Sequence, residues 1–243
     1  MEITTYAANQ PVLLLIDGLV SFEHVITYLR ADFHIIEVHV DGNRVDENIV
    51  ELEEYIKDHC AGHVDYAYGT DMGGHILMKL CARQQVHIDQ AVFGSINAKN
   101  HSRFVSSCII FWMLLIYGHL VKKKRYPWWY RLFHRQSSRA RRQYNERLAL
   151  LMLGHFGDQY NDLKSLLKWH FTSSWPASFT TDTKLHFFWS MKMGARYPRR
   201  YIKQFAHLGL VMMNQYQEEM LVVYPMRWVQ FLKNTFDPKS IPV

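Results

Sequence analysis

The segment Tyr66–His75 constrains the fold of this 243-residue chain more than any other, because it predicts a strand, a sharp turn and a helix in immediate succession. Gly69, Asp71 and Gly73 stand at alternate positions through the turn. Glycine has no Cβ, so it permits a tight bend and lets the following helix pack closely on a sheet. The pattern therefore predicts a carboxylate, that of Asp71, on a tight strand-to-helix bend.

Apolar strand patterns alternate with amphipathic helix patterns on both sides of this segment. Strand patterns occupy residues 11–16, 33–40, 64–68, 88–94, 184–190 and 210–213. Helix patterns occupy residues 21–30, 46–59, 72–84, 197–207 and 226–236. This alternation predicts an α/β fold with a mainly parallel sheet and helices on both of its faces.

The alternation stops between residues 97 and 180, where no segment has a strand pattern. Helical patterns occupy 104–121, 143–153 and 158–170. We therefore predict an α/β core formed by residues 1–96 and 181–243, and an inserted all-helical cap formed by residues 97–180.

The formal net charge of +6 is unevenly distributed. Residues 97–147 hold 12 Lys and Arg against one acidic residue, Glu146, whereas residues 1–96 hold 15 Asp and Glu against 5 basic residues. A block contrast of this kind favours contact of the basic stretch 122–142 with an anionic membrane surface or an acidic protein surface. Nucleic acid is not an expected partner, because no recognised binding motif accompanies the arginines.

Three cysteines without C-x-x-C spacing predict neither a disulfide framework nor a zinc site, and they fit a reducing, cytoplasmic location. The first residues lack the basic region of a signal peptide. The apolar run Phe104–Val121 has nearly the length of a membrane span. We favour a cap helix whose apolar side closes over a site, with peripheral membrane contact as the alternative.

In its strand–turn–helix setting, Gly69-Thr70-Asp71-Met72-Gly73 resembles the nucleophile elbow, G-x-S-x-G, of the α/β-hydrolase family. The first apolar strand with its turn, the strand at 88–94, the helical cap and the terminal strand–loop–helix also match that family. The resemblance implies that Asp71 holds the nucleophile position. It also implies that the backbone N–H groups of Met72 and Leu19 are the oxyanion donors.

The other catalytic positions depart from the family pattern. The resemblance places Met193 where the catalytic acid is expected and Gln217 where the catalytic histidine is expected, in the loop 214–219. Asp17 and Gly18 replace the usual His-Gly of the oxyanion turn. With Thr70 and Gly73, these two residues are the candidates for lining a pocket.

Three functions follow from these residues, and none needs a cofactor or a metal ion. The favoured one is a catalytically degenerate hydrolase-like protein that binds a small apolar or acyl ligand, or a protein partner, under the cap. The second is an active ester, epoxide or haloalkane hydrolase that uses Asp71 as nucleophile, which would need a histidine to activate water. The third is a membrane-surface protein that acts through the basic cap.

A smaller alternative concerns Asp17 and Asp71, which both follow the carboxyl ends of predicted strands. Such a pair could hold a metal ion or share a proton. The favoured interpretation is that each is a turn aspartate satisfied by backbone N–H groups.

Overall fold

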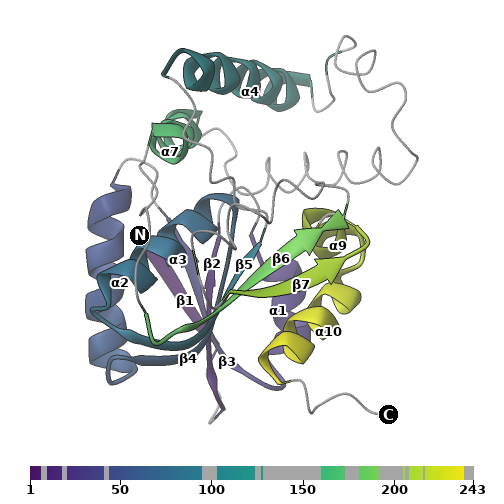
Figure 1. Ribbon diagram of the computed structural model, residues 1–243. Helices are drawn as coiled ribbons and strands as arrows, with labels where there is room; N and C mark the ends of the chain where they lie inside the picture. The colour runs from purple at the N-terminus through teal and green to yellow at the C-terminus, as the bar shows by residue number, and fades with distance from the viewer. Residues whose placement is uncertain are drawn as a thin grey trace.

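The computed structural model describes residues 1–6, 10–17, 21–40, 44–94, 103–123, 127, 160–172, 181–191, 205, 208–215 and 217–237. Their centre is a seven-stranded sheet in the order β1-β3-β2-β4-β5-β6-β7 (Figure 1). β1 pairs antiparallel with β3, and every other pair of neighbouring strands is parallel. The strands are β1 Glu2–Tyr6, β2 Val12–Ile16, β3 His34–His39, β4 His63–Thr70, β5 His87–Gly94, β6 Lys184–Ser190 and β7 Gly209–Met213.

Helices cover both faces of the sheet, as Figure 1 shows. α2 and α3 lie on one face, and α1, α9 and α10 lie on the other. The helices of the described residues are α1 Glu23–Leu29, α2 Val45–His59, α3 Asp71–Arg83, α4 Arg103–Lys123, α7 Tyr160–Thr172, α9 Gln217–Val223 and α10 Pro225–Phe236. The α/β architecture with a mainly parallel sheet is therefore confirmed.

The core is divided between the two faces by the alternation of side chains along each strand. In β2, Leu14 and Ile16 pack against one layer of helices, while Leu13 and Leu15 pack against the other. All four side chains are fully buried. A strand buried on both faces needs a continuous apolar run, which is why this segment could be identified from its sequence.

Two elements differ from the sequence predictions. β1 was not predicted, because Glu2–Tyr6 is a half-buried edge strand that contains two threonines and has no apolar run. The loop predicted at 214–219 is partly helical, since α9 begins at Gln217. The helix predicted at 143–153 lies outside the described residues, and so does the helix predicted at 197–207 apart from Phe205.

α4 and α7 come between β5 and β6 in the chain, although these two strands are hydrogen-bonded neighbours. Figure 1 places both helices beyond the carboxyl ends of the strands. α7 contacts α3 through Trp169, whose ring lies 4.8 Å from the ammonium of Lys79. The division into a core and an all-helical cap at residues 97–180 stays a prediction, because most of that segment lies outside the described residues.

Candidate functional site

The turn between β4 and α3 has no linking residue: the strand ends at Thr70 and the helix begins at Asp71. A Cβ at Gly73 would lie 2.0 Å from the carbonyl oxygen of Ile16, which ends β2. A Cβ at Gly69 would lie 2.6 Å from the carbonyl oxygen of Gly73. Only glycine fits at either position, so the start of α3 can press against the carboxyl end of β2. The strand, turn and helix predicted at 66–75 are confirmed.

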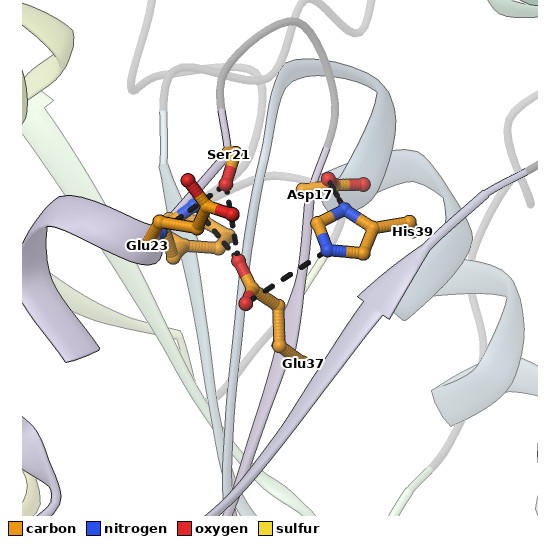
Figure 2. Close-up of polar contacts among 6 residues, drawn as sticks. Asp17, Ser21, Glu23, Glu37 and His39 are labelled. Atoms are coloured by element: carbon orange, nitrogen blue, oxygen red, sulfur yellow. Dashed lines mark hydrogen bonds and ion pairs between the residues drawn. The ribbon is translucent and has the colours of Figure 1, made fainter. Parts of the chain in front are cut away.

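A buried cluster of two carboxylates and one imidazole adjoins this turn at the carboxyl ends of β2 and β3 (Figure 2). Asp17 and Glu37 are only 2% and 1% exposed. The Nδ1 atom of His39 hydrogen-bonds to Asp17, and its Nε2 atom lies 3.8 Å from a carboxylate oxygen of Glu37. We call these three residues the Asp17–His39–Glu37 cluster.

The second oxygen of Glu37 faces the start of α1. It accepts hydrogen bonds from the backbone N–H of Phe22 at 2.9 Å and from the hydroxyl of Ser21 at 3.3 Å. Figure 2 shows Glu37 between Ser21 and His39. The cluster thus links the end of β2 to the start of α1, on either side of residues 18–20.

The electrostatics of the cluster keep the imidazole charged. The hydrogen bond to Asp17 raises the pKa of His39 from 6.5 to about 9, against the opposing effect of burial. Burial raises the pKa of Glu37, and the neighbouring His39 cation opposes that rise. At neutral pH His39 is therefore an imidazolium with a proton on each ring nitrogen, and it has no lone pair with which to act as a general base.

Comparison with known proteins identifies the fold of the chain. No protein-family model and no curated protein matches the sequence. Among solved structures, a Desulfitobacterium hafniense protein described as an α/β hydrolase family member matches with a TM-score of 0.78 at 14% identity, over 97% of this chain and 100% of that one. MenH from S. aureus matches with a TM-score of 0.65 at 10% identity, over 96% and 98% of the two chains.

A third match is Est816, described as an N-acyl homoserine lactone degrading enzyme, with a TM-score of 0.66 at 13% identity over 96% and 95% of the two chains. These likenesses agree with the strand order and with the elbow. The chain has the α/β-hydrolase fold. At such low identity the likeness extends to the fold and not to an activity.

The candidate site residues of the α/β-hydrolase fold are described to different extents. Met72 and Thr70 are buried, at 1% and 2% exposure, on the two sides of Asp71. The backbones of Asp71 and Gln217 begin α3 and α9, while their side chains lie outside the described part of the structure. Gly18, Leu19 and Met193 also lie outside it. Their catalytic roles stay predictions.

Three further histidines of the α/β core have the surroundings of structural residues. His75, one turn into α3, is buried with its ring centroid 6.2 Å from that of Trp169 in α7. His186 faces Gln90 on the neighbouring strand, and burial lowers the pKa of His186 to about 4. Burial also lowers the pKa of His24, whose Nε2 lies 3.0 Å from the carbonyl oxygen of Leu221.

His39 and Glu37 were not among the site residues predicted from the sequence. The available signal was a Glu and a His at alternate positions within the apolar segment 33–40, since charged residues are rarely buried unless they are paired. The partner could not be found from sequence, because β2 and β3 meet only in the folded sheet. Asp17, interpreted as a turn aspartate bonded to backbone N–H groups, has an imidazole partner that this interpretation did not include.

Proposed function

We propose that this hydrolase-fold protein is catalytically degenerate. It binds a small apolar or acyl ligand, or a protein partner, at the carboxyl edge of the sheet beneath α4 and α7. Hydrolysis with Asp71 as nucleophile forms an ester that a base-activated water must split. The proposal rests mainly on the state of His39, an imidazole at this edge beside the elbow.

His39 is unsuited to the missing role for two reasons. It is protonated at neutral pH, with its pKa at about 9, and both of its ring nitrogens face carboxylates. The loop where the resemblance places the catalytic histidine, residues 214–219, contains none. A carboxylate at the start of α3 has a non-catalytic explanation, because the helix dipole and unpaired N–H groups favour an anion there.

Apolar side chains on the cap helices support a ligand of apolar chemistry. Leu114 and Tyr117 of α4 and Leu163 and Leu167 of α7 are buried and belong to the same hydrophobic cluster as α3. A site closed by such side chains excludes water and favours apolar groups. Acyl chains and small neutral molecules fit this description.

Catalysis is tested with 4-nitrophenyl esters, epoxides and haloalkanes as substrates. Product release and the intact mass of the protein after incubation are measured for the wild type and for Asp71→Asn. We expect equal background rates in the two proteins and no covalent adduct. Turnover that Asp71→Asn abolishes would establish the active-hydrolase alternative. An alkyl adduct on Asp71 without turnover would show a working nucleophile that lacks its base.

Binding is tested with a photoactivatable medium-chain alcohol, followed by mapping of the crosslinked residues. We expect crosslinks on residues near the elbow and on the inner sides of α4 and α7. Excess unlabelled decanol should remove them. Crosslinks confined to α10, which lies on a face of the sheet, would contradict a site at the carboxyl edge.

A second candidate function is peripheral membrane binding through α4. Among the described helices, α4 alone has the length and mean hydropathy (1.6 over Val105–Lys123) of a membrane span, and 22% of that stretch is buried. Its inner side packs against α7. Its outer side exposes 60% of Phe111 and 53% of Trp112 and ends in Lys122 and Lys123. Aromatic side chains next to cations suit the surface of an anionic bilayer.

Vesicle sedimentation tests this second function. We expect binding to phosphatidylserine-containing vesicles that high salt weakens, and a loss of at least about tenfold in Phe111→Ser/Trp112→Ser, since both exposed rings would leave the bilayer. Met226→Ser/Phe231→Ser is the matched control, because it removes two exposed apolar side chains from α10. Equal binding by both double variants would exclude α4 as the contact.

A further inference from the structure

Three metal-ligating side chains meet at the end of the sheet opposite the elbow. His63 begins β4, His87 begins β5, and Asp89 follows His87 by two residues. Their ligand atoms all lie within 4.8 Å of one another. An Oδ1 atom of Asp89 is 3.1 Å from Nε2 of His63 and 3.0 Å from Nε2 of His87.

The sheet register explains why these side chains converge. β4 and β5 are parallel neighbours in which His63 is paired with His87, so the two imidazoles extend from the same face. Their rings stack with centroids 5.5 Å apart and planes inclined by 18°. Because side chains alternate along a strand, Asp89 extends from that face as well.

The backbone that carries the histidines is fixed by hydrogen bonds. The N–H of His63 donates to the carbonyl of Cys60 at 2.9 Å, and the N–H of His87 donates to the carbonyl of Gly62 at 2.9 Å. Ala61 and Gly62 turn the chain into β4 with φ values of 51° and 74°. A ligand set on strand ends held in this way loses little conformational freedom when it binds an ion.

We propose that His63, His87 and Asp89 form a surface site for a divalent transition-metal ion of the zinc type, with water completing its coordination. Two imidazole nitrogens and one carboxylate oxygen suit Zn²⁺ and its analogues Co²⁺ and Ni²⁺. Bonds of about 2.1 Å in a tetrahedral site place neighbouring donor atoms roughly 3.4 Å apart. The two nitrogen–oxygen distances at Asp89 are a few tenths of an ångström shorter, whereas the three ligand atoms as a set spread over up to 4.8 Å. Binding an ion therefore requires the side chains to rotate from the positions they hold in this structure.

The site lies away from the elbow. β4 runs for eight residues from His63 to Thr70, a length of roughly 23 Å at about 3.3 Å per residue. A metal ion at His63 therefore cannot contact a ligand at the carboxyl edge. Its direct effect is to join the first residues of β4 and β5, which stabilises the folded chain by mass action.

The experiment uses the full chain, freed of any affinity tag and treated with a chelator. Co²⁺ is titrated while its visible absorption is recorded, and Zn²⁺ is then added as competitor. We expect the bands of an imidazole-ligated Co²⁺ ion, saturation at one equivalent, and displacement by Zn²⁺. His63→Gln/His87→Gln should lose at least about tenfold in affinity. His59→Gln should bind as the wild type does, since His59 lies on α2 and outside the cluster.

Two results would overturn the site: a double variant that binds Co²⁺ as tightly as the wild type, or no binding by the wild type. If the double variant fails to fold, histidine modification of the wild type decides the question. Diethylpyrocarbonate should modify His63 and His87 less when Zn²⁺ is present, while His59 reacts equally in both conditions. Equal modification of all three would exclude the site.

Discussion

The Asp17–His39–Glu37 cluster makes the stability of the fold depend on pH in a defined window. The unfolded chain releases the His39 proton near pH 6.5, whereas the folded chain keeps it until about pH 9. Between these values the folded state binds one more proton than the unfolded state. The free energy of unfolding therefore falls as pH rises, and the contribution of His39 is complete only below pH 6.5.

The size of this effect follows from the shift. A rise from 6.5 to about 9 sets an upper limit of about 3 kcal/mol, because one pKa unit corresponds to about 1.4 kcal/mol. The His39 side chain is 22% exposed, so solvent screening reduces the expected loss to about 2 kcal/mol. His24 and His186, whose pKa values are lowered, act in the opposite direction and below pH 6.5. Burial raises the thiol pKa values of Cys60 and Cys81, and because unfolded thiols begin to lose their protons below pH 9, these two groups add to the fall at the upper end of the window.

Urea unfolding between about pH 6 and pH 9 measures the loss. His39→Gln should lose the part of this fall that the imidazole causes and should be less stable at pH 6 by about 3–5 kcal/mol, because two buried carboxylates lose their cation. Asp17→Asn/Glu37→Gln/His39→Gln removes all three charges and should recover most of that loss without restoring the fall that His39 causes. If the wild type and His39→Gln have the same pH dependence, the imidazole does not carry the charge that we assign to it.

Three further substitutions, two in the elbow helix α3 and one in α4, test local packing and pairing. Gly73→Ala should lower the free energy of unfolding by about 1–3 kcal/mol, because its Cβ meets backbone oxygen at 2.0 Å. Gly118→Ala, a helical glycine with nothing within 4 Å, should instead raise it by about 0.5–1 kcal/mol in the same denaturation assay. Arg83→Met should lower the free energy of unfolding by about 1–2 kcal/mol, because it removes a bidentate contact, at 2.6 and 2.9 Å, to the buried carboxylate of Glu53. A cost at Gly118 equal to that at Gly73 would refute the packing argument.

Sequence alone was enough for the parts of the fold that repeat a local pattern. The apolar run of β2 and the glycine-bounded turn at Asp71 determine their own conformations, so both were found close to their observed bounds. β1 was missed because an edge strand buries little and carries no apolar signal. α9 was missed because the resemblance to the α/β-hydrolase family placed a catalytic loop at residues 214–219, which include the first residues of this helix.

The candidate sites were harder to predict because they depend on register. Glu37 and His39 meet Asp17 only because β2 and β3 are parallel and end together, with Ile16 opposite Val38. The His63, His87 and Asp89 set likewise needs the pairing of β4 with β5, which no spacing along the chain encodes. Residues 24 apart in sequence become ligands of one ion through a sheet alignment that forms only on folding.

The charge of the carboxyl edge limits the chemistry of the ligand that we propose for this edge. Among the described residues, Asp17 and Glu37 supply two carboxylates and His39 supplies one cation, and the sequence adds Asp71 at the start of α3. Repulsion by an unbalanced carboxylate roughly 8 Å away reduces the binding free energy of an anion by on the order of 1–2 kcal/mol at an effective dielectric constant of about 20. We therefore expect decanol to bind at least about tenfold more tightly than decanoate in a calorimetric titration at neutral pH. Raising the ionic strength should leave the affinity for decanol unchanged and reduce the difference in affinity between decanol and decanoate. Tighter binding of decanoate would show that a cation outside the described residues dominates the site, and the ligand class would then be acidic.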